Sequence, residues 1–95
     1  MKVELSLNLP SGVIRLTSAL KAAGYTRKSG FKRAQLLNTT GGTLYFSRRS
    51  DVDNNNGKPV DQGKKSPNLV SGTGLVDVYI HSAAGGVAQF SGDAK

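Results

Sequence analysis

The sequence predicts an all-β fold, a small β-sandwich or jelly-roll-like barrel of roughly six to eight short antiparallel strands, with one short helical turn near residues 17–22. Two observations carry this prediction. Apolar and polar residues alternate at period two in several short segments, which is typical of half-buried strands. Turn residues interrupt these segments about every 8–12 positions. Because no linker divides the chain, residues 1–95 are expected to form a single β domain.

The N-terminal segment, residues 1–9, is predicted to be a strand or an arm. Its apolar residues alternate with polar ones, and they are Val3, Leu5, Leu7 and Leu9. Pro10-Ser11-Gly12 forms a turn. The next segment fits both a strand and a helix, and we favour a short strand near 13–16 followed by the helical turn near 17–22.

The central segment predicts a β-hairpin and then a long polar loop. Residues 31–37 and 43–47 flank a glycine-containing connection, which is a hairpin pattern. Residues 50–74 are poor in apolar groups, so a long loop with brief strands near 58–60 and 68–70 is expected.

The C-terminal segment returns to strand periodicity. Residues 75–82 are predicted to be a strand, in which one face is apolar (Val76, Val78, Ile80) and the other is polar (Asp77, Tyr79, His81). A glycine turn follows, then a last strand over 87–91. The tail, residues 92–95, is expected to be frayed.

The composition excludes several classes of protein. Cysteine is absent, so neither a disulfide framework nor a cysteine-based zinc site can exist. No apolar run approaches the roughly 18–20 residues of a membrane-spanning helix. The alternating N-terminal residues are unlike the apolar segment of a signal peptide. We therefore expect no membrane partner, and a protein that folds in a reducing cytosol or is assembled there.

Positive charge is concentrated in the first half of the chain. Residues 5–50 contain no acidic residue and eight basic ones, Arg15, Lys21, Arg27, Lys28, Lys32, Arg33, Arg48 and Arg49. The remaining residues contribute five basic and six acidic side chains, so the net charge of +7 is +8 minus 1. Such an excess predicts an acidic partner, either a nucleic acid or an acidic protein surface.

Residue types that support catalysis are scarce. His81 is the single histidine, and its place on the polar side of a strand pattern favours an ordinary surface residue over a triad base. Residues 51–55 have the alternating oxygen ligands of a calcium loop, but Gly57 comes one residue late and Gln62 stands where a glutamate is needed. We expect no enzymatic activity, no cofactor and no bound metal.

The alternative function is that of a small basic β-barrel that binds single-stranded nucleic acid. Tyr25, Phe31 and Tyr45 lie among the basic residues, and aromatic rings can stack on bases while cations contact phosphates. However, aromatic residues are only 6% of the chain and form no RNP-type cluster. Nucleic acid is therefore the second partner considered.

A family resemblance rests on motifs in a consistent order. Residues 34–46 read AQLLNTTGGTLYF, residues 50–53 read SDVD, residues 56–60 read NGKPV, and residues 78–88 read VYIHSAAGGVA. This order resembles small β-sandwich structural proteins of tailed bacteriophage virions, a family that includes head decoration, or cement, proteins. The resemblance spans residues 31–91. It departs from the usual pattern at 62–67, where two lysines and a proline replace an apolar strand.

The resemblance implies a non-enzymatic virion protein on the capsid exterior, located in the host cytoplasm before assembly. It would bind the major capsid protein, stabilise the shell and form a homo-oligomer, with a trimer favoured. The candidate capsid contacts are the cations Arg27, Lys28, Lys32, Arg33, Arg48 and Arg49. The N-terminal strand is expected to pair with the sheet edge of a neighbouring chain, with Val3, Leu5 and Leu7 as candidates.

Overall fold

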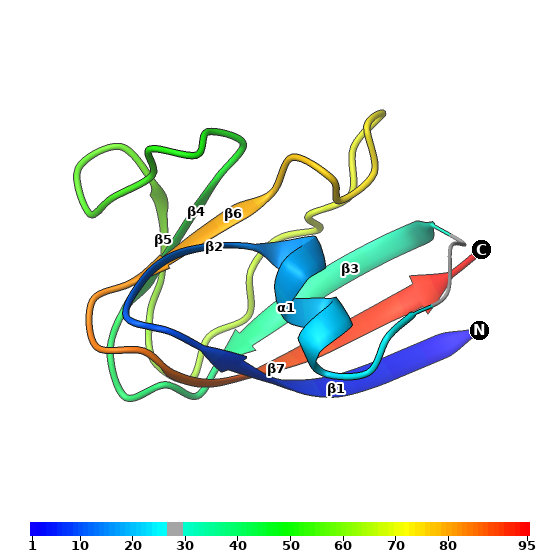
Figure 1. The fold of residues 1–95 in the computed structure, drawn as a ribbon, viewed down its shortest axis with the longest axis horizontal. Helices are drawn as coiled ribbons and strands as arrows, with labels where there is room; N and C mark the ends of the chain where they lie inside the picture. Colours follow the sequence, from blue (N-terminus) through cyan, green and yellow to red (C-terminus); the bar gives the residue numbers. More distant parts are fainter. Residues whose placement is uncertain (27–29) are drawn as a thin grey trace.

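The computed structural model describes residues 1–26 and 30–95 and folds them into two antiparallel sheets with one short helix (Figure 1). Sheet A contains, in spatial order, β1 (Lys2–Leu9), β7 (Gly86–Ala94) and β3 (Phe31–Asn38). Sheet B contains, in spatial order, β2 (Gly12–Arg15), β6 (Tyr79–Ser82), β4 (Leu44–Ser47) and β5 (Lys58–Val60). The predicted all-β class is confirmed.

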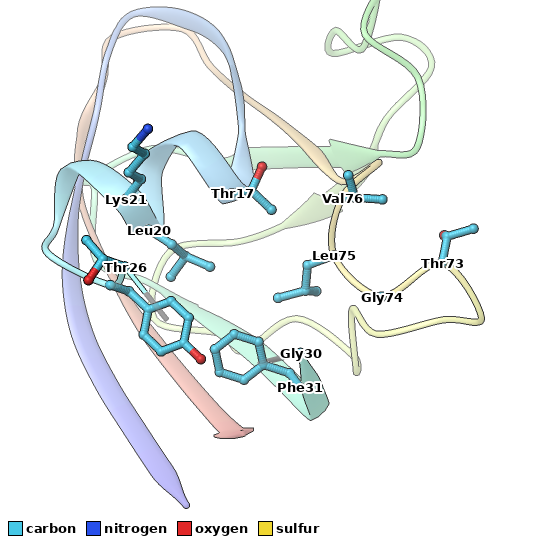
Figure 2. A pocket seen from close by; sticks show the side chains of 11 residues that line it. Thr17, Leu20, Lys21, Thr26, Gly30, Phe31, Thr73, Gly74, Leu75 and Val76 are labelled. Atoms are coloured by element: carbon cyan, nitrogen blue, oxygen red, sulfur yellow. The ribbon is translucent and has the colours of Figure 1, made fainter. Parts of the chain in front are cut away.

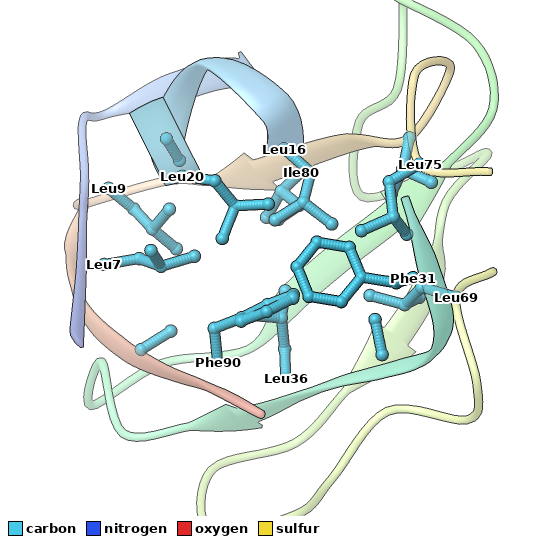
Figure 3. Close-up of a cluster of buried hydrophobic side chains, with 14 of the residues drawn as sticks. Leu7, Leu9, Leu16, Leu20, Phe31, Leu36, Leu69, Leu75, Ile80 and Phe90 are labelled. Carbon is cyan, nitrogen blue, oxygen red and sulfur yellow. The ribbon is translucent and has the colours of Figure 1, made fainter. Parts of the chain in front are cut away.

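The hydrophobic core lies between the inner faces of the two sheets (Figure 3). On β1 the predicted alternation places Val3, Leu7 and Leu9 in the core and leaves the polar residues exposed. Phe90 of β7 is 1% exposed and belongs to the same cluster. Each fully buried side chain of this size contributes about 1.5–3 kcal/mol to stability.

The predicted helical turn is α1 (Leu16–Ala22), which follows β2 directly. Leu16 and Leu20 are spaced one helical turn apart, and both point into the core (Figure 3). Gly24, at φ +99°, lets the chain leave the helix. No helix in the described part of the chain is both long and apolar enough to cross a membrane.

The predicted hairpin of residues 31–37 and 43–47 is wrong. Both strands exist, but β3 pairs with β7 in sheet A, whereas β4 pairs with β5 and β6 in sheet B. Asn38 explains the crossing between sheets, because its buried side-chain amide donates to the carbonyl oxygens of Gly42 (2.6 Å) and Val60 (2.7 Å). These bonds hold the connection in a turn that leads into the second sheet.

Three other predictions in the second half need correction. Residues 68–70 form no regular strand, and residues 75–77 form a turn, so that Val76 is 54% exposed instead of lying in the core. The last strand runs to Ala94, so the tail is not frayed. Ala94 is buried, and its N–H donates to the carbonyl oxygen of Met1 (2.7 Å), which extends the β1–β7 pairing to the end of the strand.

Candidate functional site

The cations predicted to contact the capsid do not all share one environment. Arg27 and Lys28 lie outside the described residues. Lys32 and Arg33 are exposed at the beginning of β3, beside an irregularity in its pairing with β7. No ion pair within residues 1–26 and 30–95 includes Lys32 or Arg33.

Arg48, which follows β4, is bound by other groups of the same chain. Its guanidinium contacts the Asp77 carboxylate at 2.5 Å and also donates to the carbonyl oxygen of Leu69 (2.8 Å). Burial tends to raise the pKa of Asp77, but hydrogen bonds from Thr73 and Arg48 outweigh it and hold that pKa below its ordinary value. Arg48 therefore fastens residues 69–77 to the end of sheet B.

Arg49 is neutralised locally. It donates two hydrogen bonds to the Asp51 carboxylate, at 3.0 and 2.8 Å. These hydrogen bonds lower the pKa of Asp51. Because both side chains are mostly exposed, the pair contributes little to stability, and it also weakens Arg49 as a free cation for a partner.

Both ends of the chain lie beside the beginning of β3, at the right of Figure 1, and four cations come together in this corner of sheet A. We call it the basic corner, and its members are Lys2, Lys32, Arg33 and Lys95. The register of sheet A aligns Lys2, Asp93 and Arg33 in one row across the solvent face. Asp93 already accepts a hydrogen bond from the Met1 amino group (3.1 Å), which lowers the pKa of Asp93, and nearby Lys32 lowers it further. The corner thus has more cations than carboxylates to balance them.

The backbone of β1 leaves one row of polar groups unpaired. Met1 and Ala94 exchange two backbone hydrogen bonds, with N–O distances of 3.0 and 2.7 Å. In an antiparallel ladder every second residue repeats this pattern, so the odd-numbered residues of β1 bond to β7. The N–H and C=O groups of the four even-numbered residues point away from the sheet: Lys2, Glu4, Ser6 and Asn8. No hydrogen bond among the described residues reaches these groups, which we call the open edge.

The residues predicted to pair with a neighbouring chain, Val3, Leu5 and Leu7, lie on this strand but face inward. The side chains of Val3 and Leu7 are buried in the core, and Leu5 is half-buried against it. A strand added at the open edge would bond to the even-numbered residues instead. It would extend the apolar layer formed by the odd-numbered ones.

The solvent face of sheet B presents a second surface with aromatic and cationic groups. Arg15 lies over the Tyr79 ring at 5.2 Å and donates to its hydroxyl (2.6 Å). In the neighbouring row, Tyr45 and His81 are paired across β4 and β6, with ring centroids 6.3 Å apart. Of the aromatic residues on this surface, only Tyr45 was predicted from the sequence to stack on bases. Tyr79 was placed on the polar face of the strand predicted over 75–82, and that pattern could have identified it.

A cavity of about 510 Å³ opens between α1, the beginning of β3 and residues 73–76 (Figure 2). Tyr25 and Phe31 line it with ring centroids 5.1 Å apart, and Phe31 also packs edge-on against Phe90 (5.3 Å). Two of the three aromatic residues considered for base stacking are therefore turned toward the cavity and the core. Tyr45 remains on the solvent face of sheet B.

The oxygen-rich loop at 51–57 bonds to itself. Asp53 accepts hydrogen bonds from the N–H groups of Asn55 (2.8 Å) and Asn56 (3.0 Å), and the Asn56 side chain accepts from the N–H of Asp53 (2.9 Å). In the described part of the chain, no three acidic or histidine side chains are grouped to hold a metal ion.

Comparisons with protein-family models, curated proteins and solved structures found no match for this chain.

Proposed function

We propose that this chain is a non-enzymatic structural protein of a bacteriophage virion, of the head decoration type. In this role it binds the major capsid protein on the exterior of the shell and stabilises it. The order of motifs in residues 31–91 supports the family. The basic corner is the observation that supports docking, because it gathers cations that no carboxylate of the described residues fully neutralises.

Docking through the basic corner has a clear electrostatic basis. Complementary charges steer two surfaces together and fix their register, although each rim charge adds only modest affinity. Repetition of the contact over a shell then adds avidity. Arg48 and Arg49 are given a smaller part than Lys32 and Arg33, because aspartates already bind them.

The test uses shells assembled from the major capsid protein of the same genome. The purified chain is added, the shells are sedimented, and bound copies are counted by quantitative mass spectrometry. We expect Lys32→Glu with Arg33→Glu to reduce occupancy by at least about tenfold at low salt. The matched control is Lys64→Glu with Lys65→Glu, which changes the net charge equally at exposed positions outside the corner. Equal occupancy for the two double variants would contradict the proposal.

Single-stranded nucleic-acid binding remains the second candidate, and the solvent face of sheet B favours it. Tyr45, Tyr79 and Arg15 there combine aromatic rings with a cation, as stacking platforms do. A gel-shift series with a labelled oligothymidylate, from about 50 to about 200 mM salt, should then show affinity that falls steeply with salt. Tyr45→Ala with Tyr79→Ala should weaken binding at every salt concentration, whereas Val87→Ala, on the solvent face of sheet A, should not. Weak binding that is unchanged in the double tyrosine variant would exclude nucleic-acid binding as the function.

A further inference from the structure

We propose that two copies of this chain pair through their open edges, antiparallel and about a twofold axis centred on Leu5. The inference stands on the geometry of β1 and does not depend on the proposed virion role. A long strand edge with unpaired N–H and C=O groups is a template for another strand, and folded proteins usually cover or interrupt it. Here the described residues do neither.

Backbone parity restricts how a second copy can pair. The outward groups belong to the even-numbered residues, so these must face even-numbered residues of the other copy. The same parity keeps the odd-numbered apolar residues of both copies on the core side, whereas a slip by one residue would expose them. Even-numbered residues face even-numbered ones, and odd face odd, only when the twofold axis passes through a residue and not between two residues.

The register centred on Leu5 satisfies every group of the open edge. It sets Lys2 opposite Asn8 and Glu4 opposite Ser6, with both pairs repeated by the twofold axis. Four N–H donors from each copy then find four C=O acceptors on the other, which makes eight hydrogen bonds. No charged residue faces another of the same sign.

The neighbouring registers are worse. Centring the axis on Glu4 sets two carboxylates directly opposite each other, which is destabilising. Centring it on Ser6 brings Lys2 opposite Pro10, which has no N–H to donate. Both shifts also leave part of the open edge unpaired.

Side chains at the proposed interface are compatible with it. The two copies of Leu5 would meet in a non-hydrogen-bonded pair, where Cα atoms approach to about 4.5 Å, so each half-buried leucine would be covered by the other. Each Glu4 carboxylate lies 3.3 Å from the Lys2 ammonium of its own strand, which compensates its charge near the axis. Because Lys2 faces Asn8, the two basic corners would lie at opposite ends of a six-stranded sheet.

Cysteine cross-linking tests the register, since the chain has no cysteine of its own. In a pairing centred on Leu5, position 5 alone faces its own copy, and the expected Cα separation lies within the roughly 4.4–6.8 Å that a disulfide spans. Leu5→Cys should form a covalent dimer under mild oxidation. Asn8→Cys, which would face Lys2, should stay uncrosslinked. Circular dichroism checks that both variants are folded.

Native mass spectrometry and amide exchange test the pairing without altering the core. The unmodified chain should form a dimer of twice 10.0 kDa, with slow exchange at the amides of Glu4, Ser6 and Asn8 that becomes fast on dilution. Ser6→Glu, which sets a new carboxylate opposite Glu4 on both sides of the axis, should raise the dimer dissociation constant about tenfold. Gln89→Glu adds the same charge one strand inward and should leave the constant unchanged.

Three outcomes would overturn the proposal. The first is a monomer whose open-edge amides exchange fast at high concentration, which would leave the edge for a strand of a different protein. The second is a trimer, which the family resemblance implies and which twofold pairing cannot produce. The third is equal cross-linking of folded Leu5→Cys and Asn8→Cys. None of these results would affect the capsid-binding test with Lys32 and Arg33.

Discussion

The two outer strands of sheet A differ in how their edges are treated. β1 and β3 both have eight residues and both pair with β7. The outward N–H and C=O groups of β3 belong to Ala34, Leu36 and Asn38, and each of these groups has a partner. Residues 63–69 supply backbone bonds at 2.8–3.0 Å and two side-chain acceptors, Asn68 and Ser66. The outward groups of β1 have no such cover among the described residues.

The difference shows what the long polar loop does. Its composition lacks the apolar residues for a core element, yet residues 63–69 lie along β3 and bond to it in place of another strand. The loop thereby closes one edge of sheet A. No comparable segment of the described chain lies along β1, so the outward groups of that edge have no partner among the described residues.

The largest expected difference in stability is between substitutions of the asparagine at each edge, Asn38 on β3 and Asn8 on β1. Asn38 is fully buried and holds the crossover with four hydrogen bonds of its side chain, to Gly42, Val60 and Thr40. Asn38→Ala should lower the free energy of unfolding by about 3 kcal/mol, because it leaves buried polar groups unpaired. Asn8→Ala, at the exposed open edge, should change it by less than about 0.5 kcal/mol. Urea denaturation at one protein concentration measures both, and equal losses would show that the two edges do not differ.

A serine at each edge sharpens the comparison. Ser66 is 2% exposed, and its hydroxyl accepts the outward N–H of Leu36 (2.9 Å). Ser66→Ala should cost about 1–2 kcal/mol, because the buried N–H loses its acceptor. Ser6→Ala removes an exposed hydrogen bond to Gln89 and should be close to neutral. The same denaturation series measures this pair, and a neutral Ser66→Ala would mean that water replaces the hydroxyl.

The arginines after β4 should differ as well. Arg48→Ala should lower the urea midpoint measurably, because it frees the Leu69 carbonyl beside the covered edge as well as Asp77. Arg49→Ala should leave the midpoint unchanged, because the pair with Asp51 is exposed and local. A larger effect at Arg49 than at Arg48 would contradict the assigned roles.

The smallest expected effect is a pH dependence at Asp77. Because its pKa in the folded protein lies below the ordinary value of 3.8, its contribution to stability is present above that pH and is lost as the pH falls through the folded pKa. Asp77→Asn should therefore be less stable than the parent protein near neutral pH, and the difference should shrink as the pH falls below the ordinary pKa of 3.8. Asp61→Asn is the control, because the Asp61 side chain forms no ion pair within the described residues. A difference that is constant with pH would exclude the charge of Asp77 as its cause.

Period-two alternation was a good guide wherever one face of a strand is buried and the other is solvated. It located β1 and β4, and helical spacing located the helix after β2, with small errors at the boundaries. The pattern failed for the pairing of β3 with β4, since a glycine turn between two strands fits a hairpin and a crossover equally well. The sequence also did not show that Arg48 is bound by a carboxylate whereas Arg33 is not. Asp77 is far from Arg48 in sequence, and the ion pair forms only after folding.

The sequence by itself determined the all-β class, the short helix, the inward apolar residues of β1 and the uneven charge. These properties follow from local spacing and composition, which are readable along the chain. Only the tertiary structure decided which cations remain unpaired, which polar loop covers β3 and which edge stays open. The physical reason is that backbone hydrogen bonds carry no sequence signature of their partner, so long-range pairing decides which N–H and C=O groups are satisfied.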